Sequence, residues 1–360
     1  MAPPSATHSH ETGSATLEPG LTKSQAATKE ATMPKLEFPT PRNFEDKLEE
    51  RAYQKGRLAL AFRIFAKFGF DEGVAGHITL RVGFIPTGDH LVAHVRRMRA
   101  KPFNSWIFWG VQVAEVPRRG EVVGRDPLKP DHFWVNPFGV AWPLLRASDL
   151  ILVNPDGQVV DGGPCRLLNT AGTDPPSPSL PASENSLTKP NKNTAYMIHH
   201  AVHVARPEVN CVAHSHSIHG RAFSTLGRAL DITTQDACAF FDDLALYTSF
   251  RGVVLAAEEG QAIAAALGGK KAALLQSHGL LTCARTVEAA VFWFVSLEKC
   301  CRVQLLADAA AAGQGGKTVK IARAEAETTY QTVGTEMAGW FSAKPMFDVM
   351  ESESGVDCKW

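Results

Sequence analysis

The chain has 360 residues, of which 44% are apolar and 21% are charged, and its 37 basic and 37 acidic residues give a formal net charge of zero. A chain of this length can bury the core of one large or two ordinary globular domains. The balanced charge, without a basic run, gives no electrostatic footprint for nucleic acid or a membrane surface, so neither partner is expected. The seven cysteines include no Cys-x-x-Cys pair, and we find no long apolar segment or signal-peptide core, so we expect a cytoplasmic protein.

The N-terminal part of the chain changes character near residue 42. Residues 1–41 are rich in Ser, Thr, Ala and Pro and are predicted to be a disordered tail, because they lack the apolar side chains that would offset the entropy of ordering. Residues 44–70 then place apolar side chains at helical spacing between charges, which predicts a long amphipathic helix. A Gly-rich turn follows and leads into a strand.

Two irregular segments, at about 82–125 and 165–189, interrupt the pattern of helices and strands. The first has no sustained period of 2 or 3.6, and the second is rich in Pro, Ser and Asn. We predict that both are insertions outside the core, either translated introns or a genuine lid over the site. Between them, residues 132–135 predict a strand and residues 149–160 predict a β-hairpin.

Histidines in the second half of the chain suggest a metal site. In the stretch NCVAHSHSIHG, His214 and His216 follow a short apolar run, and alternate side chains of a strand share one face. His278 ends a second apolar run at a Ser-His-Gly turn. Three imidazoles suit Zn, Fe, Ni or Cu and leave a coordination position open, although a His-x-His pair alone is more often two ordinary surface or core histidines.

Two further histidines, and the C-terminal part of the chain, are expected to have structural rather than metal-binding roles. His199 and His203 lie four apart on a helix predicted before the His-x-His strand, but they lack the adjacent Glu of a metalloprotease helix, so packing beneath the sheet is expected. The last long helix is predicted over 287–312. The polar residues 313–360 are predicted to be a mobile tail, which leaves 42–312 as the globular domain.

Several stretches together resemble the class II aldolase/adducin head-domain family. The resemblance implies an α/β/α fold, with a mainly antiparallel central sheet between helix layers, often in a homotetramer with the site near a subunit boundary. It also implies Zn, or another divalent transition metal, on His214, His216 and His278. The stretches that carry it cover about residues 44–312 in the family's order: GVAGHITLR, HFWVNPFG, ASDLILVNPDGQVVDGG, ARPEVNCVAHSHSIHGRAFSTLGR, GVVLAAEEGQAIAAALG and KAALLQSHGLL.

The resemblance also suggests how a substrate binds. The aldolases of this family cleave sugar phosphates with Zn as a Lewis acid, and their phosphate lies against Gly-rich turns. By position, these turns correspond to Gly76 and His77, with Phe138 and Gly139 as a second wall. His77 departs from the aldolases, whose turn has Asn at this place.

The proton carriers of the aldolases are missing. Ala195 stands where these enzymes have a catalytic Glu, and Gln235 aligns with the Tyr that many of them use as a proton donor. Neither residue can move a proton. Asp236, beside Gln235, is the nearest titratable candidate for a replacement acid/base, and the cap of a turn is its alternative role.

Two hypotheses of different classes follow from this comparison. The first is a metal-dependent enzyme that acts on a small hydroxy-carbonyl compound, as a C–C lyase or a related epimerase or decarboxylase. The second is a non-catalytic, adducin-like module for assembly or for binding the actin cytoskeleton. The enzyme is favoured because adducins add a long basic tail, and nothing like it follows Ala312.

Overall fold

A computed structural model gives the arrangement of most of the predicted globular domain. The predicted tail over residues 1–41 falls almost entirely outside the described residues, as do most of the two predicted insertions. Within the first insertion, the structure describes a small hairpin of β2 (Ile107–Phe108) and β3 (Val111–Gln112). The described residues are 39–73, 76–81, 107–108, 111–112, 128–129, 131–168, 194–250 and 257–355.

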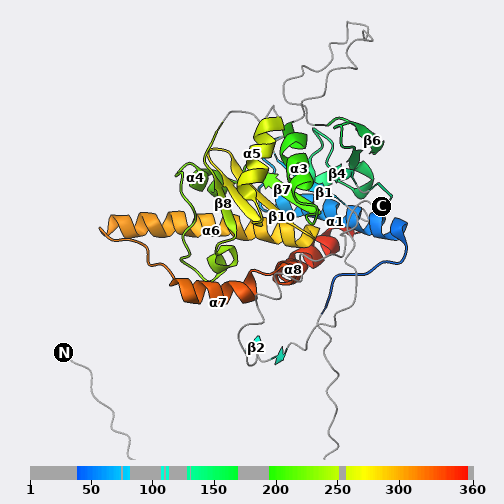
Figure 1. Cartoon of the computed structure of the whole chain (residues 1–360). Coiled ribbons are helices and arrows are strands. Elements are labelled where there is room, and N and C mark those ends of the chain that lie inside the picture. The colour runs from blue at the N-terminus through cyan, green and yellow to red at the C-terminus, as the bar shows by residue number, and fades with distance from the viewer. Residues whose placement is uncertain are drawn as a thin grey trace, which may run out of the picture. The chain divides into compact units, whose positions relative to one another are not determined.

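Eight of the described strands form one sheet. They are β1 (His77–Leu80), β4 (Phe133–Val135), β5 (Ile151–Val153), β6 (Val159–Gly162), β7 (Cys211–Ser215), β8 (Leu244–Tyr247), β9 (Ala272–Leu275) and β10 (Gly279–Ala284). Their order across the sheet is β6-β5-β4-β1-β7-β10-β9-β8 (Figure 1). Neighbouring strands in this sheet are antiparallel except for the parallel pair β8 and β9, so the prediction of a mainly antiparallel sheet is confirmed.

The fold also contains helices, and polar side chains cap the N-termini of two of the longest. Asp46 accepts a hydrogen bond from the N–H of Leu48 at the start of α1, and Thr286 accepts one from Ala289 at the start of α6. No helix in the described ranges is both long and apolar enough to cross a bilayer. The α-helices are α1 (Lys47–Lys67), α3 (Thr194–Ala205), α4 (Ile218–Ser224), α5 (Ala257–Leu267), α6 (Val287–Gly313), α7 (Arg323–Val333) and α8 (Glu336–Ser354), with short 3-10 helices η1 (Trp142–Leu144), η2 (Ala147–Asp149) and η4 (Asp236–Phe240).

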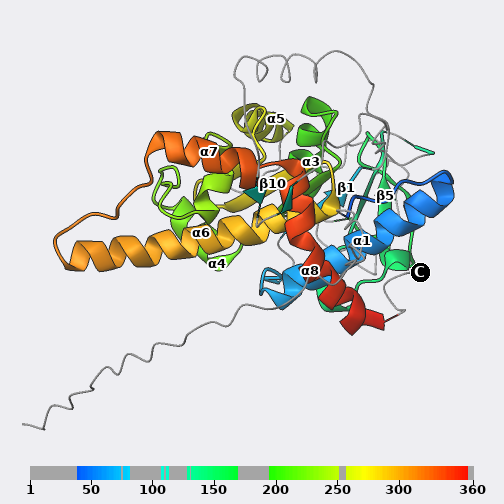
Figure 2. The ribbon, with the colours of Figure 1, turned by 90° about the horizontal axis from the view of Figure 1, so that it is seen from below.

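Alternate residues of the middle strands belong to two different hydrophobic clusters. In β9, Ala272 and Leu274 pack in a cluster that includes α1, α6 and α8, whereas Ala273 and Leu275 pack with α3 and α5. Figure 1 shows α3 and α5 on one side of these strands and α6 and α8 on the other, and Figure 2 shows α1, α6 and α8 together from below. Burial of both strand faces explains why these strands are continuous apolar runs in the sequence.

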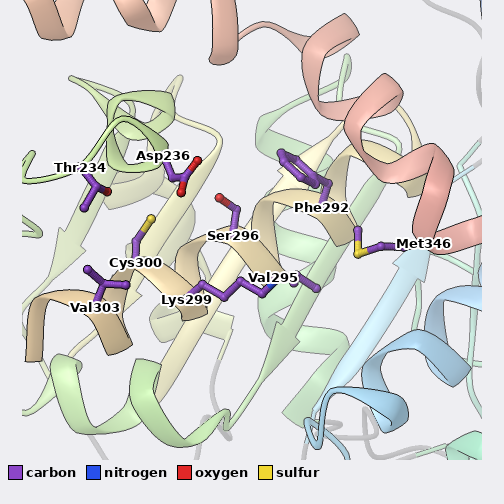
Figure 3. A pocket seen from close by; sticks show the side chains of 9 residues that line it. All are labelled: Thr234, Asp236, Phe292, Val295, Ser296, Lys299, Cys300, Val303 and Met346. Atoms are coloured by element: carbon purple, nitrogen blue, oxygen red, sulfur yellow. The ribbon is translucent and has the colours of Figure 1, made fainter. Parts of the chain in front are cut away.

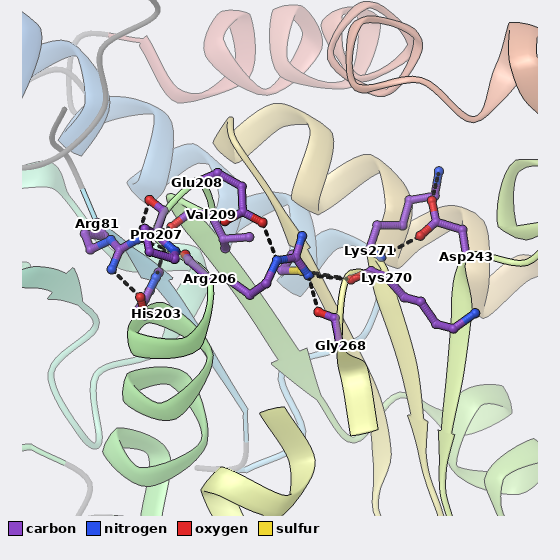
Figure 4. Close-up of polar contacts among 11 residues, drawn as sticks. Arg81, His203, Arg206, Pro207, Glu208, Val209, Asp243, Gly268, Lys270 and Lys271 are labelled. Carbon is purple, nitrogen blue, oxygen red and sulfur yellow. Dashed lines mark hydrogen bonds and ion pairs between the residues drawn. The ribbon is translucent and has the colours of Figure 1, made fainter. Parts of the chain in front are cut away.

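Arginines fix the C-terminal end of α3 (Figure 4). The guanidinium of Arg81, which follows β1, donates to the backbone carbonyl of His203 in the last turn of α3. It also donates to the carbonyls of Arg206 at 2.9 Å and Pro207 at 2.7 Å, just beyond the helix. Arg206 itself donates to the carbonyl of Gly268, just after α5, at 2.7 Å. The last carbonyls of a helix lack partners within the helix, and cations there are favourable. These contacts therefore hold α3 in place against β1 and α5.

The structure corrects the prediction of a mobile tail over residues 313–360. This region contains α7 and α8, and Phe347 of α8 is fully buried in the cluster that contains α1 and α6. Glu336, at the start of α8, accepts hydrogen bonds from two backbone N–H groups just before α6. The prediction failed because apolar residues are sparse in this region, and because Pro345 lies inside α8, where Pro normally opposes a helix.

Replacing Phe347 with Ala tests whether α8 belongs to the core. The substitution leaves a cavity beside α1 and α6, so we expect the free energy of unfolding to fall by about 3–5 kcal/mol. Denaturant unfolding measures this change. Val349→Ala is the control, because Val349 is 50% exposed on the same helix. A Phe347→Ala variant no less stable than this control would mean that α8 does not pack as described.

Candidate metal centre

Three histidines meet at one end of the sheet. His214 is in β7, His216 follows the last residue of that strand, and His278 directly precedes β10. The two strands are antiparallel neighbours, with Leu280 opposite Ser215. The end of β7 therefore lies beside the start of β10, which brings together side chains that are far apart in the sequence.

The geometry of the three rings suits a single ion. Their centroids are 5.3 Å apart for His214 and His216, 4.7 Å for His214 and His278, and 4.9 Å for His216 and His278. One ring nitrogen from each residue lies within 4.8 Å of the other two. Nitrogens bound to Zn at about 2.0–2.1 Å lie roughly 3–4 Å apart, so small side-chain rotations would close the triad on one ion. The structure thus brings the three predicted ligands together.

The surroundings of the triad favour neutral imidazoles with a defined tautomer. Nδ1 of His214 lies 2.8 Å from the carbonyl oxygen of Leu280, which can only accept, so Nδ1 carries the proton and Nε2 has the lone pair. Burial lowers the pKa of His214 well below its ordinary value. Burial, followed by the nearby His216, lowers the pKa of His278 to about 4. Neutral imidazole is the form that binds metals.

Gly76 and His77, which were predicted to contact the substrate, lie next to the triad. His77 is directly opposite His214 in the pairing of β1 with β7. Gly76 has a φ of +96°, and a Cβ on it would lie 3.0 Å from the carbonyl oxygen of His214 and from the ring of Trp142. Only glycine fits there without strain. Burial, and then His216, lowers the pKa of His77 to about 3, so His77 is neutral near pH 7. Substrate contact by either residue stays a prediction.

Phe138 and Gly139 lie at the same end of the sheet. β4 runs antiparallel to β1, so the chain after Val135 emerges where β1 begins. Phe138 is partly buried, and its N–H donates to the carbonyl of Leu167 at 2.7 Å. Gly139 is exposed, with a φ of +81°. Their place is compatible with a wall of the site, and their role stays a prediction.

The structure places Asp236, the predicted acid/base, in a different environment. It is the first residue of η4 and lines a cavity against α6 and α8 (Figure 3). None of the three histidines is among the described residues that line it, and among the described residues the carboxylate of Asp236 does not belong to the group of ligand atoms that the triad forms. The other lining residues are Thr234, Phe292, Val295, Ser296, Lys299, Cys300, Val303 and Met346.

His199 and His203 form a buried pair beneath the sheet, as the helical spacing suggested. The hydroxyl oxygen of Thr79 lies 2.8 Å from Nδ1 of His199 and 2.9 Å from Nε2 of His203. Nδ1 of His203 lies 3.3 Å from the carbonyl oxygen of Val209, so this nitrogen carries the proton. Thr79 then donates to His203 and accepts from His199. These bonds dock α3 on β1.

Sequence reasoning missed Glu298, a buried carboxylate of α6 that contacts the turn after His216. The sequence did contain a signal for it. Glu298 lies four residues after Phe294 and three before Cys301, so it shares the apolar face of the predicted helix. An acidic residue on such a face needs buried hydrogen-bond donors.

Comparisons with known proteins identify the family of this chain. The model of the Class II Aldolase and Adducin N-terminal domain matches residues 56–305. Decarboxylase NovR of Streptomyces niveus is 34% identical over 86% of this chain and 88% of its own length. The 4-hydroxy-3-prenylphenylpyruvate oxygenase/4-hydroxy-3-prenylbenzoate synthase of Streptomyces roseochromogenus subsp. oscitans is 34% identical over 86% of both chains. The structure of L-fuculose 1-phosphate aldolase from Glaciozyma antarctica PI12 has a TM-score of 0.65 and 39% identity, over 88% of this chain and 96% of that one.

Because these histidines are buried and neutral, we expect the folded protein to become less stable as the pH falls. His77 has a pKa of about 3 when folded and an ordinary value of 6.5, so its contribution to stability is complete above pH 6.5 and is lost as the pH falls toward 3. At pH 5 this loss amounts to about 2 kcal/mol. Denaturant unfolding of the metal-free protein at pH 7.5 and pH 5 should therefore show about 2 kcal/mol less acid destabilisation in His77→Gln than in the unaltered chain. An equal loss of unfolding free energy in both proteins would contradict the lowered pKa of His77.

Proposed function

Because this chain belongs to the class II aldolase and adducin family, we propose that it is a metal-dependent enzyme that acts on a small hydroxy-carbonyl compound. The reaction is a C–C bond cleavage or a related decarboxylation or epimerisation. The convergence of His214, His216 and His278 carries the proposal, because three neutral imidazoles with an open position suit catalysis by a metal. The enzyme names of two relatives that match over most of their length support it.

The three histidines would hold Zn or another divalent transition metal, which supplies Lewis-acid polarisation of the substrate's oxygens when bound. His214 presents Nε2, because its Nδ1–H is directed at the carbonyl of Leu280. The neutral ring of His77, beside the triad, offers the substrate a hydrogen-bonding group without a charge. A carboxylate or phosphate would therefore be held by hydrogen bonds at this position.

The turns at the end of the sheet would contact the remainder of the substrate. Gly76 brings the backbone close to His214, because it has no side chain at the point of contact. Phe138 and Gly139 form the opposite wall in this proposal, since the chain reaches them directly after β4. Both walls lie at the end of the sheet where the histidines meet.

Proton transfer needs a group other than the aldolase Glu and Tyr, since Ala195 and Gln235 replace them. Asp236 remains our candidate. The three histidines do not line its cavity and its carboxylate is not part of their cluster in the described chain, so in this proposal it serves the metal centre of a neighbouring subunit. This arrangement requires a homo-oligomer, as the family resemblance implies.

The alternative of a non-catalytic, adducin-like assembly module is less favoured. Such a module would not need three neutral histidines around one point.

The first test of the proposal is metal binding. We expect one divalent ion per chain by elemental analysis. His278→Ala should reduce affinity by more than the roughly 10- to 100-fold that loss of an outer partner costs, because it removes a ligand. His132→Ala is the control, since His132 precedes β4 at the other end of that strand and bonds to Asp131. Equal metal content and affinity in all three proteins would refute the assigned site.

The second test is sugar-phosphate cleavage, the activity named for the Glaciozyma antarctica structure. We expect this chain to cleave fuculose- or ribulose-type phosphates poorly, because each missing proton carrier is typically worth about 10²- to 10⁴-fold in rate. Ala195→Glu should raise the rate, and His278→Ala gives the metal-free baseline. Brisk Zn-dependent cleavage by the unaltered chain would show that another residue supplies the proton.

A further inference from the structure

Glu298 is a buried carboxylate with an unusual set of partners. It lies on α6 and is 6% exposed, yet it contacts the turn that directly follows His216. Its Oε2 accepts from the hydroxyl of Ser217 at 2.6 Å and from the N–H of Gly220 at 2.6 Å. Its Oε1 accepts from the N–H of His219 at 2.8 Å and lies 2.9 Å from Nδ1 of the same residue.

These contacts replace the normal cap of α4. Ser217 is the N-cap residue of this helix, but its side chain makes no capping bond within the described part of the chain, because the hydroxyl donates to Glu298 instead. The N–H groups of His219 and Gly220, which an N-cap side chain would ordinarily satisfy, both donate to Glu298. A carboxylate at a helix N-terminus is favourable, and charge-assisted hydrogen bonds are about twice as strong as neutral ones.

The same turn is adjacent to His216. This residue lies beyond the last paired residue of β7, between two anchored serines. Ser215 donates to the carbonyl of Phe70, and Ser217 donates to Glu298. The hydroxyls of the two serines are thus bonded to Phe70 and Glu298, while the rings of His214 and His216, which alternate with the serines, lie together in the triad.

The start of α4 also packs closely against β10, the strand that contains the hydrogen-bond partner of His214. A Cβ added to Gly220 would lie 2.3 Å from the side chain of Leu280, so glycine is needed for this close approach. The carbonyl of Leu280 is the partner of Nδ1 of His214. The turn that Glu298 contacts is therefore next to His216 and packs against Leu280, the residue whose carbonyl orients His214.

We propose that Glu298 is a positioning residue of the metal centre, which holds the turn at 217–220 so that the ring of His216 faces His214 and His278. This inference rests on the proposed function, because it assumes that the triad binds a metal. Glu298 itself does not contact the ion or the substrate. Without it, the donors of the turn lose their partner, and the backbone that carries His216 is free to move.

The test compares metal affinity with stability in three variants. Glu298→Gln keeps the shape but turns an amide NH2 toward donors, so we expect about 10- to 100-fold weaker Zn binding in competition with a chromophoric chelator. Ser217→Ala removes one of the bonds and should give a smaller loss. Glu288→Gln is the matched control, because Glu288 is a buried carboxylate of the same helix that pairs with Arg57 at 2.6 Å. It should lower stability and leave Zn affinity unchanged.

The possible outcomes separate this inference from the function on which it rests. If the unaltered chain binds no Zn, the proposed function fails and this inference fails with it. If the unaltered chain binds Zn and Glu298→Gln binds it equally tightly, only the positioning role is overturned. Should Glu298→Gln not fold, Ser217→Ala decides: weaker Zn binding with faster hydrogen exchange at the amides of His219 and Gly220 supports the role, and unchanged affinity overturns it.

Discussion

Antiparallel pairing of β7 with β1 on one side and β10 on the other is the constraint on which the site depends. It places His214 opposite His77 and brings the turn before β10, with His278, beside the end of β7. A slip of one residue would turn each side chain to the opposite face of the sheet. The register is protected because alternate residues of β7 pack into different hydrophobic clusters, with Ala213 in one and Val212 in the other. Formation of the core and assembly of the triad are thus the same event.

Burial and hydrogen bonding together give the triad its chemical character. Burial keeps the rings neutral by lowering the pKa of His214, His216 and His278, and a backbone carbonyl selects the tautomer of His214. The buried carboxylate of Glu298 accepts hydrogen bonds from backbone and hydroxyl donors of the turn that follows His216. The cost of desolvating the carboxylate is thereby offset, and the ligand-bearing turn becomes part of the core rather than a loose loop.

Features that depend on local pattern could be predicted from the sequence. Strand alternation placed His214 and His216 on one face, and a second apolar run that reaches a Ser-His-Gly turn supplied His278. The family resemblance then joined the three as ligands of one metal. Features that depend on distant partners could not be predicted in the same way. Phe347 is isolated among polar residues and becomes a core residue only when α8 meets α1 and α6. Asp236 is adjacent to Gln235 in the sequence, but the fold places it in a cavity against α6 whose described lining includes none of the three histidines.

The central claim is that three histidines bind one divalent metal at the end of the sheet. Anomalous diffraction from crystals of the Zn-loaded protein, recorded on both sides of the Zn absorption edge, tests it most directly. We expect one strong anomalous peak about 2.0–2.1 Å from a ring nitrogen of each of His214, His216 and His278. A fully loaded crystal with its Zn peak elsewhere, or with these three rings turned away from the ion, would contradict it.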